Sequence, residues 1–335
     1  GVTGTKGKTT TTFMIKSVLE KQGLKVGLIG TICTYIGDKN LGDNDRTTPE
    51  SLELQQLLSR MVEEKCDVAV MEVSSQGLML DRVAGIDFDF GIFTNLSEDH
   101  IGPNEHKDYA EYRMWKSKLF SLCDTGIFNA DDENYEEILG GHGCKVITYG
   151  MSEGLDYVAT NIHLYGEKGS LGIEYDLEGN QQEKILVGMP GMFSVHNSLA
   201  AIAVARQMDV PMDIIKEILT RIKVKGRVES VSISDEFSLI IDYAHNAVSL
   251  ESILTTLREY EPKRLVSLFG CGGNRSKGRR YEMGEVSGKL ADFTIITSDN
   301  PRDEEPLAII EDIKIGMGKT QGSFIEIPDR KEAIK

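Results

Sequence analysis

A glycine- and threonine-rich loop lies at the start of the chain, where residues 4–10 have the sequence GTKGKTT. Glycines allow backbone N–H groups to close around phosphate oxygens, and a helix that begins at the loop adds the positive end of its dipole. Lys8 would contact the outer phosphates, and the Thr9 hydroxyl would ligate Mg²⁺. The pattern therefore predicts a nucleoside triphosphate site, with ATP as the expected nucleotide. The expected contacts are Gly4, Thr5, Lys6, Gly7, Lys8, Thr9 and Thr10.

A carboxylate and an imidazole follow two apolar segments further along the chain. Glu72 lies at the end of the segment 68–73, and His100 lies shortly after the segment 88–94. Near-continuous apolar runs of this length are typical of buried parallel strands. Ligands bind at the carboxyl ends of such strands in open α/β sheets. We therefore expect Glu72 and His100 to lie at a ligand-binding edge.

The elements that would position these residues alternate between helix and strand. Apolar residues at a period of 3.6 predict the helices, and short apolar runs predict the strands. The alternation indicates a doubly wound α/β fold with a mainly parallel sheet. The predicted helices cover residues 9–22, 50–64 and 107–122, and the predicted strands cover 26–30, 68–73, 88–94, 126–129 and 145–148.

The pattern changes near residue 155. Three segments there alternate apolar and polar residues, which predicts a small antiparallel sheet inserted into the first domain. These segments are 157–165, 170–177 and 184–187, and helices are predicted at 193–208 and 211–222.

A second alternation of predicted strands and helices starts near Gly226 and indicates a Rossmann-like domain. We therefore predict two domains, a central ATP-binding domain at 1–226 and a C-terminal domain at 227–335. The strands predicted in the second domain are 237–242, 264–269, 293–298 and 323–327.

The predicted elements at the two ends of the chain are short. A phosphate loop needs a buried strand before it, and only Gly1, Val2 and Thr3 precede this one. The chain stops on Lys335, inside a predicted helix. We therefore expect a segment of a longer protein, with an incomplete C-terminal domain.

Composition limits the partners and the compartment. The formal net charge of −16 argues against nucleic acid and membrane surfaces as partners, because both are polyanionic. Five scattered cysteines without a CxxC pair indicate reduced thiols in a cytoplasmic protein. The sequence has no run of about 18 apolar residues, so no membrane span is expected. We expect the protein to be a monomer.

Several motifs follow one another in the order of a known family. They are GTKGKTT, EVSS at 72–75, FTNLSEDH at 93–100, YRMWKSKLF at 112–120, GMFSVHN at 191–197, GRVE at 226–229 and DYAH at 242–245. Together they resemble the Mur ligases, which extend the peptide of the bacterial cell-wall precursor. The resemblance covers essentially the whole chain. It implies an ATP-dependent, ADP-forming acid–amino-acid ligase of peptidoglycan synthesis.

The resemblance also implies roles for residues beyond the loop. Glu72 and His100 match residues that help to bind Mg²⁺, together with Thr9. Lys116 matches a lysine that CO₂ carbamylates in many members, and the carbamate would be a further Mg²⁺ ligand. Lys118 is the alternative if the register differs. The residues that the resemblance assigns to the nucleotide are Asn197, Arg227, Asp242 and His245, and those that it assigns to catalysis are Lys8, His100, Lys116 and Arg227.

Two groups of residues resemble the substrate contacts of the family. The first would bind the UDP-N-acetylmuramoyl-dipeptide and consists of Thr47, Thr48, Ser74 and Arg82. The second would bind the incoming amino acid and consists of Arg275, Asp299, Asn300, Pro301 and Arg302.

The second group indicates which amino acid is added. The sequence DNPR at 299–302 resembles the motif of members that add meso-diaminopimelate. Arg302 could hold the second carboxylate of that amino acid through two hydrogen bonds, and it would repel the ammonium of lysine. Asn274 and Ser276 replace acidic residues that are common in the family, which leaves a lysine-adding ligase open. A folylpolyglutamate synthetase and a nucleotide-binding regulatory module without chemistry also stay open.

The family mechanism that the resemblance implies is acyl-phosphate ligation. The γ-phosphate of ATP passes to a carboxylate of the muramoyl dipeptide, and the amino group of the incoming amino acid displaces it. Lys8, Mg²⁺ and Arg227 would neutralise the charge that develops.

Overall fold

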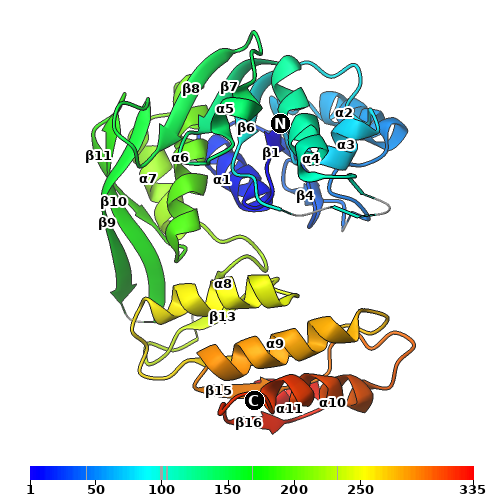
Figure 1. Cartoon of the computed structure of the whole chain (residues 1–335). Helices are drawn as coiled ribbons and strands as arrows, with labels where there is room; N and C mark the ends of the chain where they lie inside the picture. Colours follow the sequence, from blue (N-terminus) through cyan, green and yellow to red (C-terminus); the bar gives the residue numbers. More distant parts are fainter. Residues whose placement is uncertain (43, 99–100, 103–104, 168, 232) are drawn as a thin grey trace. The chain divides into compact units, whose positions relative to one another are not determined.

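The computed structural model describes all residues except 43, 99–100, 103–104, 168 and 232 (Figure 1). The chain forms two compact units. One comprises Gly1–His163 and Gly172–Val224, and the other comprises Leu164–Leu171 and Lys225–Lys335.

The first unit is built on a mainly parallel sheet. In spatial order, β2 pairs with β5, a single bridge joins Glu72 to Val2 of β1, and β1, β6, β7 and β8 continue in parallel. Although only three residues precede the phosphate loop, Val2 is fully buried because β1 has a neighbour on each side. The strands are β1 (Val2–Thr3), β2 (Val26–Ile29), β5 (Val68–Met71), β6 (Phe88–Phe93), β7 (Cys123–Asn129) and β8 (Lys145–Gly150).

Antiparallel strands extend this sheet at both edges. β3 and β4 add to β2, and they were not predicted because strands of three and two residues carry too little alternation to detect. β9, β10 and β11 add to β8 rather than forming a sheet of their own. The join is parallel, between the buried Tyr149 and Tyr157. The added strands are β3 (Thr34–Ile36), β4 (Lys39–Asn40), β9 (Tyr157–Glu167), β10 (Ser170–Gly179) and β11 (Glu183–Val187).

Helices cover the sheet in two groups. α1, α6 and α7 pack against one another (Figure 1). α2, α3, α4 and α5 contribute to a separate hydrophobic cluster that also includes Ile29, Phe93 and Phe128 from the strands. This is the doubly wound arrangement that the sequence predicts. The helices are α1 (Lys8–Lys21), α2 (Ser51–Glu63), α3 (Ser75–Met79), α4 (Tyr109–Ser117), α5 (Tyr135–Leu139), α6 (Met192–Gln207) and α7 (Met212–Arg221).

The second unit contains a parallel sheet in the order β14, β15, β16. β13 pairs antiparallel with β12, so the predicted strand 237–242 lies in a separate two-stranded sheet. Among the described residues, none of the helices combines the length and apolarity needed to cross a membrane. The elements are β12 (Glu229–Val231), β13 (Leu239–Ile241), α8 (Ala247–Arg258), β14 (Val266–Phe269), α9 (Lys277–Leu290), β15 (Phe293–Ile296), α10 (Pro306–Met317), β16 (Phe324–Glu326) and α11 (Arg330–Ile334).

Candidate functional site

The phosphate loop connects β1 to α1 and is shaped by two glycines. Gly7 has a φ of 86° at the start of α1, a conformation that favours glycine. A Cβ at Gly7 would lie 2.5 Å from Asn197 Oδ1, and one at Gly4 would lie 1.9 Å from Thr94 Oγ1. The loop therefore passes so close to these two side chains that only glycine fits. The fold brings Asn197, which the family resemblance assigns to the nucleotide, to the loop.

Two lysine ammonium groups converge on the loop. Lys8 Nζ donates to the carbonyl oxygens of Gly4 at 2.8 Å and Thr5 at 3.1 Å. Lys116 Nζ, from α4, donates to the same Gly4 oxygen at 2.8 Å. Lys116 is 2% exposed, whereas Lys118 is exposed in the 3₁₀ turn that follows α4. The geometry thus places Lys116, and not Lys118, beside the loop.

Two residues directly after β6 form hydrogen bonds with Lys6 of the phosphate loop. Asn95 Oδ1 accepts the N–H of Lys6 at 2.9 Å, and Thr94 Oγ1 donates to the Lys6 carbonyl at 2.7 Å. The sequence motif at 93–100 indicated only the histidine of this segment as a site residue, so these two contacts were not predicted. A signal was present, because polar residues directly after a buried strand face the ligand-binding edge.

Glu72 lies at the end of β5 and is 1% exposed. Its Oε1 accepts the N–H of Thr31 at 2.8 Å, and its Oε2 accepts the Thr31 hydroxyl at 2.9 Å. A Cβ at Gly30 would lie 2.4 Å from Oε1. The loop after β2 therefore orients the carboxylate, and Thr31 is a site residue that no motif in the sequence indicated.

Two residues predicted to bind Mg²⁺ have chemically suitable side chains. Mg²⁺ takes oxygen ligands, keeps several waters, and needs only one or two carboxylates when phosphates supply the rest. Glu72 and Thr9 are oxygen donors of this kind. Within the described part of the chain, no group of three or more His, Cys, Asp and Glu could hold a metal alone. His100, the third predicted ligand, lies outside the described residues.

The residues predicted to bind the muramoyl substrate form one hydrogen-bonded group in the first unit. Thr47 Oγ1 lies 3.0 Å from Thr31 Oγ1. Thr48 Oγ1 accepts the N–H of Ser74 at 2.9 Å. Arg82 donates to the Thr48 carbonyl at 3.1 Å and pairs with Glu50 at 2.9 Å. Glu50 thus neutralises part of the positive charge that Arg82 could offer to an anionic ligand.

A buried polar chain leads away from the phosphate loop. Thr5 Oγ1 lies 3.0 Å from the Tyr112 hydroxyl. The Tyr112 ring contacts the His106 ring, whose Nε2 lies 2.8 Å from Ser75 Oγ. His106 is fully buried and was not predicted, because a histidine outside the family motifs gives no signal in a single sequence.

The second unit gathers the predicted nucleotide contacts of the GRVE and DYAH segments. Asp242 Oδ2 accepts the N–H of Val228 at 2.9 Å, which joins the two segments. The Arg227 guanidinium lies over the Tyr243 ring, 4.9 Å from its centroid. His245 Nδ1 lies 3.0 Å from the Tyr243 carbonyl oxygen. Arg227, Asp242 and His245 are therefore neighbours.

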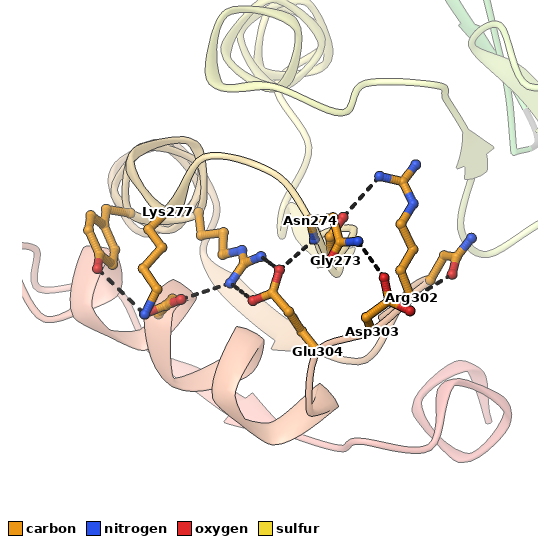
Figure 2. Close-up of polar contacts among 10 residues, drawn as sticks. Gly273, Asn274, Lys277, Arg302, Asp303 and Glu304 are labelled. Carbon is orange, nitrogen blue, oxygen red and sulfur yellow. Dashed lines mark hydrogen bonds and ion pairs between the residues drawn. The ribbon is translucent and has the colours of Figure 1, made fainter.

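The predicted amino-acid contacts lie on two loops of the second unit, after β14 and after β15. Arg302 Nη1 donates to the Gly273 carbonyl at 3.0 Å, which joins the loops (Figure 2). Asn300 Oδ1 accepts the Arg302 N–H at 3.2 Å. Arg275 and Asp299 are exposed on these loops, and Pro301 is half-buried.

Comparison with known proteins agrees with the motifs. Residues 2–205 match the Mur ligase middle domain, and residues 226–335 match the Mur ligase glutamate ligase domain. UDP-N-acetylmuramoyl-L-alanyl-D-glutamate–2,6-diaminopimelate ligase of Caldanaerobacter subterraneus is 44% identical over all of this chain and 68% of its own length. The corresponding ligase 1 of Clostridium acetobutylicum is 45% identical with the same coverage.

Solved structures give the same result. A structure of a UDP-N-acetylmuramoyl-L-alanyl-D-glutamate–2,6-diaminopimelate ligase superposes with a TM-score of 0.73 at 29% identity, covering 99% of this chain and 68% of that one. Mycobacterium tuberculosis folylpolyglutamate synthase has a TM-score of 0.70 at 16% identity, covering 99% and 81% of the two chains, which shows a shared fold only. The chain belongs to the Mur ligase family of ATP-dependent amide ligases, which act in peptidoglycan precursor synthesis and use ATP and Mg²⁺.

Proposed function

We propose that the protein joins meso-diaminopimelate to UDP-N-acetylmuramoyl-L-alanyl-D-glutamate through an acyl-phosphate intermediate. The observation that carries the choice of amino acid is Arg302 in the sequence DNPR, beside the backbone of Gly273. A guanidinium binds a carboxylate through two parallel hydrogen bonds, and diaminopimelate has one more carboxylate than lysine. The names of relatives that are 44–45% identical support the same substrate.

The proposed reaction uses the residues around the phosphate loop in distinct ways. Backbone N–H groups of residues 4–10 bind the phosphates, and Lys8 neutralises charge on the oxygens that are transferred. Asn197 of α6 is assigned to the nucleotide, and so, by the family resemblance, are Arg227, Asp242 and His245. Mg²⁺, when bound through Thr9, Glu72 and His100, supplies positive charge beside the transferred phosphoryl group.

Lys116 is proposed to carry a carbamate. In this step the ammonium first loses a proton to water. The neutral amine then attacks CO₂, an N–C bond forms as one C=O π bond opens to C–O⁻, and a second proton passes from nitrogen to water. The product is an anion in place of a cation, and it would offer oxygen ligands to Mg²⁺. The support is the position of Lys116, which is buried beside the loop and reaches Gly4.

The muramoyl substrate is proposed to bind at Thr47, Thr48, Ser74 and Arg82. Thr48 donates to the Glu72 carbonyl oxygen, and Ser74 and Arg82 both contact Thr48. Thr47 reaches the Glu72 carboxylate through the Thr31 hydroxyl. The incoming amino acid is assigned to Arg275, Asp299, Asn300, Pro301 and Arg302. The division of labour between an ATP-binding domain at 1–226 and an amino-acid-binding domain at 227–335 is part of this proposal.

The place of action is proposed to be the cytoplasm, where ATP and a UDP-linked precursor are both supplied. That the enzyme acts as a monomer stays a prediction, and light scattering on the purified protein tests it. Folylpolyglutamate synthesis is disfavoured by the Thr47-Thr48-Pro49 and DNPR segments. A lysine-adding ligase remains the second candidate because of Asn274 and Ser276.

The test of the proposal is ADP release by the purified protein with Mg²⁺ and ATP. UDP-N-acetylmuramoyl-L-alanyl-D-glutamate plus meso-diaminopimelate is compared with folate plus glutamate. ADP release that requires both members of the first pair is expected. Release with the folate pair alone would overturn the proposal.

A further inference from the structure

Two loops of the second unit are locked together at Gly273. The Gly273 N–H donates to the Asn300 carbonyl at 2.8 Å, and Arg302 Nη1 donates to the Gly273 carbonyl at 3.0 Å (Figure 2). A Cβ at Gly273 would lie 1.8 Å from the Pro301 oxygen. The loop after β14 and the DNPR loop after β15 are therefore in direct backbone contact.

Both loops contain a residue with a positive φ, 54° at Asn274 and 51° at Arg302. Asparagine tolerates this left-handed region, but arginine seldom occupies it. Such conformations persist only where the surroundings impose them. Something next to these loops must therefore hold Asn274 and Arg302 in place.

The carboxylates that follow Arg302 bind Asn274. Glu304 Oε1 accepts the Asn274 N–H at 2.5 Å, and Asp303 Oδ2 accepts its side-chain amide at 2.7 Å. Figure 2 shows both carboxylates turned toward the loop of Asn274. The loop after β14 is thereby tied to the two residues directly after Arg302.

Arg280 binds the carboxylate of Glu304. Its Nη1 and Nη2 donate to the two Glu304 oxygens at 2.8 and 2.6 Å, a two-pronged ion pair. Arg280 is 1% exposed, and its Nη1 also donates to Asp312 Oδ2 at 2.9 Å. A buried charge without a partner lowers the stability of the fold, so the arrangement strongly favours the single geometry in which Arg280 is paired.

The helices that carry this pair are themselves fixed closely. A Cβ at Gly316 of α10 would lie 1.9 Å from the Tyr281 carbonyl oxygen of α9, and one at Gly284 would lie 2.2 Å from the Ile313 oxygen. The close approach lets Arg280 on α9 reach Asp312 on α10. The helix pair thus provides a rigid base for Glu304 and the loops above it.

We propose that Arg280 and Glu304 are positioning residues for the amino-acid substrate, because they hold the backbones of Asn274 and Arg302 in the conformation that recognition requires. The inference rests on the proposed function, in which Arg302 binds the incoming amino acid. It assigns a role to two residues that need not touch the substrate.

The test is Glu304→Gln. Glutamine keeps the size and one acceptor oxygen but puts an amide where Arg280 needs a second carboxylate oxygen. The KM for meso-diaminopimelate is expected to rise about tenfold or more, as for loss of one charged hydrogen bond, while the KM for ATP changes by no more than about twofold. Glu311→Gln is the matched control on α10, where Glu311 pairs with Lys314 at the surface.

A double-mutant cycle separates positioning from general support of the fold. If Glu304 acts through Arg302, then Glu304→Gln adds little to the effect of Arg302→Ala on the KM for the amino acid. Additive effects, or equal rises in KM for ATP and amino acid, would overturn the inference. Arg280→Lys, which keeps the charge but loses the two-pronged geometry, repeats the test if Glu304→Gln does not fold.

Failure of the proposed function has a different signature. If the wild-type protein releases ADP with lysine and not with meso-diaminopimelate, the proposed substrate is wrong. The same cycle is then run with lysine. A KM for lysine that rises in Glu304→Gln only when Arg302 is present would still support positioning, and additivity would still exclude it.

Discussion

Lys116 and Gly4 are 112 residues apart in the chain, yet Lys116 Nζ donates to the Gly4 carbonyl oxygen at 2.8 Å. The contact joins the last turn of α4 to the phosphate loop. It places a primary amine, 2% exposed, directly beside the loop in which ATP would bind. The role of Lys116 in turnover is therefore the first point to test.

Lys116→Ala is expected to lower kcat by about 100-fold or more, because it removes a charged group beside the transferred phosphoryl. Lys118→Ala is the matched control, since Lys118 is exposed two residues away. ADP release under saturating ATP measures both. Equal activity of the two variants would show that Lys116 has no part in the reaction.

The carbamate on Lys116 has its own test that does not depend on activity. The protein is incubated with ¹³C-bicarbonate, and a carbamate carbonyl signal is sought by NMR. The signal is expected in wild-type protein and in Lys118→Ala, and it is expected to be missing in Lys116→Ala. A signal that survives in Lys116→Ala would assign the carbamate elsewhere.

Gly7→Ala is expected to weaken nucleotide binding about tenfold or more. A Cβ there would lie 2.5 Å from Asn197 Oδ1, so the loop must move, and each lost phosphate hydrogen bond is worth about 1.5–3 kcal/mol. Titration calorimetry with ADP measures the Kd. Gly23→Ala is the control, because Gly23 also has a positive φ, 101°, but a Cβ there meets nothing within 4 Å. Equal losses of affinity in both variants would contradict the account.

Gly316→Ala is expected to destabilise the second unit by about 1–3 kcal/mol, as overpacking does. The added Cβ would lie 1.9 Å from the Tyr281 carbonyl oxygen, a backbone atom that cannot turn aside. Gly318→Ala is the control, since its Cβ would lie 3.4 Å from the nearest atom. Thermal unfolding measures both, and an unchanged Tm for Gly316→Ala would show that α9 and α10 adjust freely.

Glu304 should make stability depend on pH in a defined window. The hydrogen bonds from Arg280 and then from the Asn274 N–H lower the pKa of Glu304 from 4.5 to about 2. A lowered pKa means that the ionised carboxylate stabilises the fold above about pH 4.5, and that this contribution is lost as the pH falls toward 2. The Tm difference between wild type and Glu304→Gln should therefore shrink over that interval. A difference that stays constant with pH would contradict the ion pair.

Lys116 came from the family resemblance, whereas local patterns predicted the phosphate loop, the buried strands and the position of Glu72 at the end of a strand. They succeed because glycine conformation, helix dipoles and apolar periodicity act over a few residues. They did not predict Thr31, whose contact with Glu72 depends on β2 and β5 lying side by side.

Arg280 and Glu304 could not be predicted for a similar reason. Their pairing depends on how closely α9 and α10 approach, which no local pattern encodes. The edge strands β3 and β4 were too short to detect, and the join of β9 to β8 is a matter of tertiary pairing.

The central claim is tested most directly by ADP formation that depends on the amino acid. The protein is given Mg²⁺, ATP and UDP-N-acetylmuramoyl-L-alanyl-D-glutamate, with meso-diaminopimelate or lysine in parallel. The account predicts ADP release with meso-diaminopimelate and a kcat/KM for lysine lower by about 100-fold or more, since lysine loses charged hydrogen bonds to Arg302 worth about 1.5–3 kcal/mol each and meets its positive charge instead. A preference for lysine would contradict the role given to Arg302.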